Sequence, residues 1–113
     1  MLFRSGKETE KLVNSEILES LGKEGILINV ARGSVVDQDA LIHFLKNKLI
    51  LAAGLDVYTN EPNIPKELMS LDNTVLLPHI ASGTVETRNA MGQLVYDNIE
   101  NFFKGKNLIS PVV

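Results

Sequence analysis

The stretch that decides the fold is Ile-Leu-Ile-Asn-Val-Ala-Arg-Gly-Ser-Val-Val-Asp, residues 26–37. Its first part, residues 26–30, is too short for a helix, rich in β-branched side chains and apolar on both faces. This pattern is typical of a strand buried in a parallel sheet. Arg32 and Gly33 follow its carboxyl end, which in an open α/β sheet is the edge where ligands bind. An arginine there offers a planar fork of donors for a carboxylate or a phosphate.

The composition narrows the class of protein. A chain of 113 residues with 44% hydrophobic residues can bury the core of one domain. The net charge of −3 with interspersed signs provides no basic stripe for nucleic acid. Cysteine is absent, which excludes disulfides and thiolate metal sites, and no apolar run has the length of a membrane span or a signal peptide. We therefore expect a soluble, cytoplasmic protein that binds neither nucleic acid nor membranes.

Helical patterns alternate with the apolar runs. Asn14, Asp37 and Thr84 are typical helix N-caps, and apolar residues at helical spacing follow each of them. The helix that begins at Thr84 is the longest, and Gly105 is placed to end it. Residues 65–71 are predicted to form one short helical turn. The sequence thus predicts an α/β fold in which three parallel strands alternate with helices, followed by a long C-terminal helix.

Each predicted strand leads into polar side chains of catalytic type. The second and third strands are predicted at residues 51–57 and 75–77. Arg32 follows the first strand, Asp56 and Glu61 belong to the end of the second and the loop after it, and His79 follows the third. Parallel strands have their carboxyl ends at one edge of the sheet, so these groups can meet in one crevice.

Each of these side chains also has a simpler interpretation. Arg32 alone is most often a solvated loop residue, His79 a hydrogen-bonded loop histidine, and Glu61 a surface carboxylate in a turn. Asp56 alone is a residue that caps a strand end. Together they are more specific, because a carboxylate beside a histidine stabilises the imidazolium and makes it a proton donor, while an arginine can orient a substrate carboxylate. The set suits chemistry on a carbonyl next to a carboxylate.

No other familiar constellation is present in the sequence. There is no His-x-x-x-His metal spacing, no Gly-x-Ser-x-Gly elbow and no glycine-rich phosphate loop.

Three motifs together resemble the family of D-isomer-specific 2-hydroxyacid dehydrogenases. They are Ile-Leu-Ile-Asn-Val-Ala-Arg-Gly with Val-Val-Asp (26–33 and 35–37), Gly-Leu-Asp-Val-Tyr-Thr-Asn-Glu-Pro (54–62) and Leu-Leu-Pro-His-Ile-Ala-Ser (76–82). They occur in the family's order from about residue 8 onward, and within the family the chain looks closest to glyoxylate and hydroxypyruvate reductases.

The resemblance implies part of a doubly wound, Rossmann-like sheet and NAD(P)-dependent exchange between a 2-keto acid and a D-2-hydroxy acid. It implies that Arg32 binds the substrate carboxylate and carbonyl, that His79 gives a proton to the carbonyl oxygen, and that Glu61 holds His79 protonated. It also implies that Asp56 hydrogen-bonds the carboxamide of the nicotinamide. The residues it implies around the nicotinamide end of NAD or NADP are Val30, Ala31, Arg32, Asp56, His79, Ala81, Ser82 and Gly83.

Two features depart from the family pattern. Ala81 stands where relatives often have glycine, and its methyl group slightly constrains the approach of the backbone to the cofactor. The Gly-x-Gly-x-x-Gly turn that holds the pyrophosphate in this family is absent from the sequence, as is the residue that selects the adenine ribose.

The resemblance also implies a domain organisation. Residues 1–7 are interpreted as a leader or truncated end, 8–104 as the C-terminal portion of a dinucleotide-binding domain, and 105–113 as a tail that returns to the substrate domain. We expect a homodimer for an intact enzyme, and marginal stability or self-association for this chain alone. The alternatives are an inactive fragment and a non-catalytic interaction or regulatory module of the same superfamily. A nucleotide-binding module of another kind is disfavoured by the missing phosphate loop.

Overall fold

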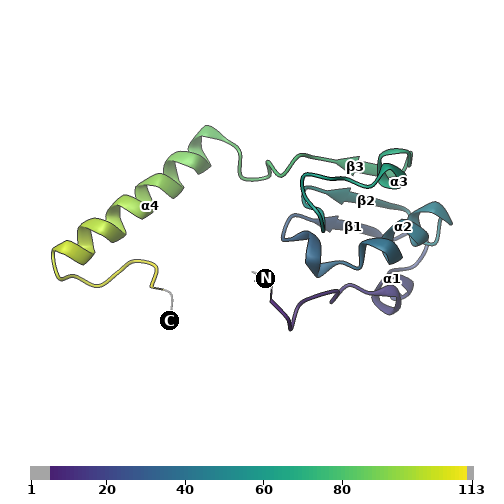
Figure 1. Cartoon of the computed structure of the whole chain (residues 1–113), viewed down its shortest axis with the longest axis horizontal. Coiled ribbons are helices and arrows are strands. Elements are labelled where there is room, and N and C mark those ends of the chain that lie inside the picture. Colours follow the sequence, from purple (N-terminus) through teal and green to yellow (C-terminus); the bar gives the residue numbers. More distant parts are fainter. Residues whose placement is uncertain (1–5, 112–113) are drawn as a thin grey trace. The chain divides into compact units, whose positions relative to one another are not determined.

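The computed structural model describes residues 6–111, which form two compact units (Figure 1). The first unit ends at Ile80 and contains α1 (Ser15–Leu21), β1 (Ile26–Asn29), the 3-10 turn η1 (Gly33–Val35), α2 (Gln38–Lys46), β2 (Ala52–Leu55), α3 (Lys66–Met69) and β3 (Thr74–Leu76). The second begins at Ala81 and contains α4 (Val85–Phe103). Residues 1–5 of the expected leader and 112–113 of the expected tail lie outside the described residues. The domain boundaries inferred from the sequence stay a prediction.

The three strands form one parallel sheet in the order β1-β2-β3. Figure 1 shows their arrows pointing the same way, with helices in the connections. The predicted α/β fold with three alternating parallel strands and a long C-terminal helix is confirmed.

Helices α1, α2 and α3 pack on one face of this sheet and form the core of the first unit. Each contributes at least one fully buried side chain, among them Leu18, Leu41 and Leu68, at 0 to 1% exposed. From β2 the alternate residues Ala53 and Leu55 face the same cluster. Alternate residues of β2 therefore pack against the apolar stripes that the sequence predicts for the helices.

The opposite face of the sheet corrects the expectation that the first strand is buried on both sides. Ile26 and Ile28 are 55% and 70% exposed. The register places Ile28 beside Gly54 and Gly54 beside Val75, which is 64% exposed. The helices of the first unit contribute their buried residues to the other face, so the described residues of this unit form no second layer on this apolar face. The apolar pattern of the strand did not indicate that one of its faces is exposed.

The predicted helix boundaries are confirmed by their caps. Side-chain oxygens of Asn14, Asp37 and Thr84 each accept a hydrogen bond from a backbone N–H in the first turn of the following helix. Asp37 also forms an ion pair with Lys11 at 3.1 Å. The hydrogen bond from Lys11 and then that from the backbone of Ala40 hold the pKa of Asp37 below its ordinary value. Gly105, at φ +65°, follows the end of α4 in the left-handed conformation that favours glycine.

Helix α4 buries none of its residues, and its predicted apolar stripe is exposed: Met91, Leu94, Val95, Ile99, Phe102 and Phe103. Within residues 6–111, no helix combines the length and apolar character needed to cross a membrane.

Leu68 and Met69 are neighbours on α3 and provide a test of the core. Leu68 is 0% exposed and Met69 is 56% exposed. We expect Leu68→Ala to lower the free energy of unfolding by about 2–5 kcal/mol, because it leaves a cavity. Met69→Ala, the matched control, leaves no cavity and changes it by less than about 1 kcal/mol. Urea denaturation followed by circular dichroism measures both values, and equal losses would contradict this description of the core.

Candidate active site

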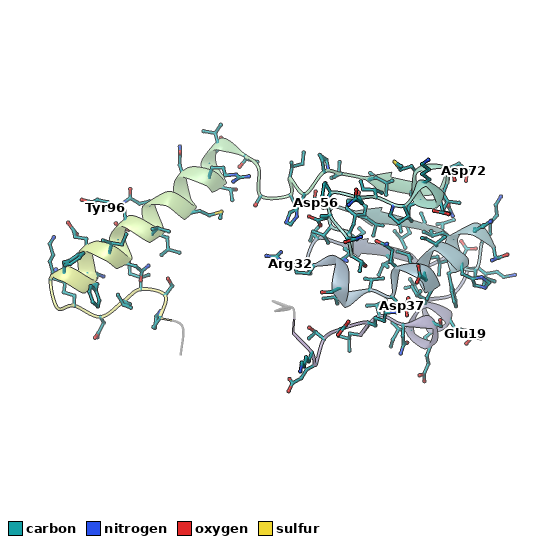
Figure 2. The ribbon with its side chains drawn as sticks, viewed as in Figure 1. Glu19, Arg32, Asp37, Asp56, Asp72 and Tyr96 are labelled. Carbon is teal, nitrogen blue, oxygen red and sulfur yellow. The ribbon has the colours of Figure 1, made fainter. Side chains whose placement is uncertain are left out.

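The three parallel strands end at the same level. Asn29 lies beside Leu55 in the register, and Leu55 lies beside Leu76. The loops that follow the strands therefore start side by side at one edge of the sheet. Figure 2 shows Arg32 and Asp56 at this edge. Arg32, Asp56, Glu61 and His79 of the first unit all follow strand ends at this edge.

Glu61 and His79 form the central contact of this edge. Nδ1 of His79 lies 2.7 Å from Oε2 of Glu61, and the other carboxylate oxygen, Oε1, accepts a hydrogen bond from the backbone N–H of Tyr58 at 2.8 Å. The hydrogen bond from His79, followed by that from Tyr58, lowers the pKa of Glu61. With Nδ1 engaged by the carboxylate, the imidazole has its Nε2 available for other partners.

The backbone on either side of His79 is held by buried side chains of the loop after β2. Asp56, 2% exposed, accepts a hydrogen bond at Oδ1 from the backbone N–H of Ile80 at 2.8 Å. The hydroxyl of Tyr58 lies 2.9 Å from the carbonyl oxygen of Leu77. Burial raises the pKa of Tyr58, so this hydroxyl keeps its proton and can donate it. His79 itself adopts φ +57°, an uncommon conformation that these anchors on both sides support.

Arg32 lies in a loop that packs on the loop of Tyr58. Its side chain is exposed, and Nη1 donates a hydrogen bond to the carbonyl oxygen of Ala31 at 2.6 Å. Among residues 6–111, no carboxylate forms an ion pair with Arg32. At Gly33 an added Cβ would overlap the carbonyl group of Tyr58 and the backbone nitrogen of Thr59. Glycine is therefore required here, because only its lack of a side chain lets the two loops touch.

The remaining predicted residues fall into two groups. Val30, 60% exposed, and the half-buried Ala31 belong to the first unit and line an apolar groove beside β1. Ala81, Ser82 and Gly83 are exposed and belong to the second unit, which is described by itself. In the part of the chain that the structure describes, no three His, Asp or Glu side chains are grouped to hold a metal ion.

The sequence interpretation overlooked two supporting residues, Asn29 and Tyr58. Both are buried, and both hydrogen-bond through their side chains to the backbone of loops that carry site residues. A polar residue at the end of an apolar strand is the feature that could have indicated Asn29. Tyr58 fits an apolar pattern, so nothing in the sequence indicated the contacts of its hydroxyl.

The lowered pKa of Glu61 predicts how stability depends on pH. Above the ordinary value of 4.5, Glu61 is ionised in the folded and the unfolded chain, and its bonds to His79 and Tyr58 contribute fully. As pH falls below 4.5 and through the lowered folded pKa, this contribution is lost. We expect Glu61→Gln to destabilise the chain most at neutral pH, and its difference from the unsubstituted chain to shrink towards pH 3. Urea midpoints from pH 7 to 3 measure this, with the exposed Glu24→Gln as control, and a constant difference would contradict it.

Comparison with known proteins assigns the chain to a family. Residues 1–81 match the family model described as "D-isomer specific 2-hydroxyacid dehydrogenase, NAD binding domain". Glyoxylate/hydroxypyruvate reductase A of Arabidopsis thaliana is 49% identical over 107 residues, which is 95% of this chain and 34% of that protein. The 2-ketogluconate reductase of Gluconobacter oxydans is 49% identical over 108 residues, 96% of this chain and 35% of that protein.

Solved structures show the same relationship. An NADPH-dependent glyoxylate/hydroxypyruvate reductase from Sinorhizobium meliloti, solved in complex with NADP and malonate, is 48% identical with a TM-score of 0.92. The match covers 99% of this chain and 35% of that one. The chain thus spans about a third of the length of the relatives it matches. This chain belongs to the D-isomer-specific 2-hydroxyacid dehydrogenase family, and it matches the NAD-binding domain of that family.

Proposed function

We propose that this chain supplies the catalytic edge of an NAD(P)H-dependent reductase that converts a small 2-keto acid, such as glyoxylate or hydroxypyruvate, into the D-2-hydroxy acid. The observation that carries the proposal is the 2.7 Å contact between His79 and Glu61 at the carboxyl edge of a parallel sheet. The names of the relatives, several of them glyoxylate reductases, support the substrate class.

Each side chain has a role that follows from its chemistry. The guanidinium of Arg32 is exposed and not ion-paired with a described carboxylate, so it can bind the substrate carboxylate through two parallel hydrogen bonds. His79, protonated and held at Nδ1 by Glu61, donates a proton from Nε2 to the carbonyl oxygen. Glu61 does not touch the substrate in this scheme. It orients the imidazole and stabilises its charge.

The residues present fit the nicotinamide end of NAD or NADP. Exposed Val30 and half-buried Ala31 follow the carboxyl end of β1 and line an apolar groove beside that strand, a surface suited to a flat ring. When bound, the reduced cofactor would supply the hydride for the carbonyl carbon. Asp56 of the first unit is proposed as a partner of the carboxamide. The cofactor role of residues 81–83 stays a prediction from the sequence. Assays with NADH and with NADPH distinguish the two cofactors.

Activity can be tested in the 113-residue chain and in a chimera. In the chimera, the 113-residue chain replaces the matching third of the Sinorhizobium meliloti reductase. We expect the chimera to oxidise NADPH or NADH with glyoxylate and hydroxypyruvate. His79→Ala and Arg32→Ala should each lower kcat/KM by about a hundredfold or more, because one removes the proton donor and the other the carboxylate clamp.

His43→Ala is the matched control, because His43 is an exposed histidine of α2 outside this edge, and it should leave kcat/KM unchanged. A folded chimera that reduces no 2-keto acid would contradict the proposed function. Unchanged turnover in the Arg32 or His79 variants would contradict the assigned roles.

We further propose that the protein acts in the cytoplasm and associates with copies of itself. The absence of cysteine suits a reducing compartment. Two apolar surfaces support association, namely the open sheet face around Ile28 and the exposed stripe of α4. Sedimentation equilibrium of the 113-residue chain should show dimers or larger species. A monomer that unfolds cooperatively would contradict this.

A further inference from the structure

We propose that Asn29 is the positioning residue for Arg32, which it holds through the amide of its side chain. Asn29 is the last residue of β1 and is 6% exposed, so its polar side chain is buried at the edge where the site forms. The proposal rests on the proposed function, because it concerns how an arginine that binds substrate is held in place.

Both ends of the Asn29 amide bind the loop that carries Arg32. Nδ2 donates a hydrogen bond to the carbonyl oxygen of Arg32 at 3.0 Å, and Oδ1 accepts one from the backbone N–H of Ala31 at 3.1 Å. An amide is suited to this because it has a donor and an acceptor on separate atoms, and the two bonds together agree with one orientation of the amide. The side chain thus closes a short loop over residues 30–32.

Two further hydrogen bonds hold the loop: the carbonyl oxygen of Arg32 also accepts one from the N–H of Val35 at 3.3 Å, and Nη1 of Arg32 donates one to the carbonyl oxygen of Ala31. Val30 is 60% exposed and Arg32 is exposed, so neither anchors the loop by burial. Immediately after Arg32, Gly33 packs against the backbone of Tyr58. The backbone of Arg32 is therefore held by the Asn29 amide, by the N–H of Val35 and, through Gly33, by the contact with Tyr58; the bond from Asn29 to the Arg32 carbonyl oxygen, at 3.0 Å, is shorter than that from Val35.

Asn29 also connects this loop to the part of the site that holds His79. Its backbone carbonyl oxygen accepts a hydrogen bond from the N–H of Asp56 at 3.0 Å. Asp56 in turn accepts from the N–H of Ile80, the residue after His79. A continuous series of hydrogen bonds thus runs from the backbone of Arg32 to the backbone beside His79. Losing the amide should displace Arg32 and leave the pair of His79 and Glu61 in place.

Asn73 provides a matched control at the other end of the sheet. It is a partly buried asparagine that precedes β3, and its Nδ2 lies 3.3 Å and 3.2 Å from the carbonyl oxygens of Leu45 and Leu51. Asn73 and Asn29 thus share a residue type and a kind of bond, and only Asn29 lies at the carboxyl edge. A purely structural role predicts the same consequences for both.

The test uses Asn29→Leu, which keeps the branching and the number of heavy atoms of the side chain and removes both hydrogen bonds without adding charge. In the chimera described above, we expect it to raise KM for glyoxylate about tenfold or more, with kcat reduced less and KM for NADPH almost unchanged. The pH profile of kcat should stay that of the unsubstituted chimera. Asn73→Leu should lower the melting temperature and leave KM unchanged.

A double-mutant cycle with Arg32→Ala separates positioning from general destabilisation. If Asn29 acts through Arg32, Asn29→Leu should change kcat/KM less than about twofold once Arg32 is replaced. An equal loss with and without Arg32 would overturn the proposal, as would a KM effect of equal size from Asn73→Leu. If Arg32→Ala itself has no effect, the role assigned to Arg32 fails, and nuclear magnetic resonance then decides whether Asn29 positions the loop.

Nuclear magnetic resonance of the 113-residue chain gives a readout without catalysis. Asn29→Leu should shift the backbone amide signals of Ala31 and Gly33 and speed hydrogen exchange at Ala31, whereas Asn73→Leu should not. If Asn29→Leu fails to fold, Asn29→Asp keeps the acceptor for Ala31 and loses the donor for Arg32, so it should shift the signal of Gly33 more than that of Ala31. Unchanged signals at both residues would overturn the proposal whatever the activity.

Discussion

The common register of the three parallel strands is the constraint on which the candidate site depends. Asn29, Leu55 and Leu76 lie side by side as the last residues of their strands, so the three following loops leave the sheet together. A shift of one residue in either pairing would turn the buried residues of β2 to the open face. The helical layer on the other face prevents such a shift, because Ala53 and Leu55 belong to its core. Packing of the core therefore sets the level at which the loops of the candidate site begin.

Above the strand ends, exposed side chains that can bind a substrate are supported by buried polar side chains that hold the backbone of the loops. Arg32 and His79 are accessible to solvent, whereas Asn29, Asp56 and Tyr58 are at most 6% exposed and hydrogen-bonded to loop backbone. Buried polar groups are costly unless they are hydrogen-bonded, so each of them restricts its loop to one arrangement. A preorganised site requires such support, because the side chains that bind a ligand must be held in position by their neighbours.

Two large apolar surfaces are left uncovered by the described residues. The sheet face that contains Ile26 and Ile28 is exposed, and α4 buries none of its residues. Apolar surfaces of this kind usually contact another layer of protein. Their apolar residues follow the pattern of a buried strand and of an amphipathic helix. Such a pattern is the same whether or not a second layer covers the apolar face. That is why the burial of β1 on both faces was predicted wrongly while its position along the chain was predicted well.

The sequence by itself determined the order of the elements, their caps and the presence of an arginine, a glutamate and a histidine after three successive strands. These properties depend on local spacing, since caps, helical stripes and short β-branched runs act over a few residues. Only the tertiary structure decided that His79 touches Glu61, that Gly33 must lack a side chain against Tyr58, and that Asn29 holds the loop of Arg32. Two of these contacts join residues far apart in the chain, and the third depends on where β1 ends. Such contacts are set by packing and register, which no local pattern encodes.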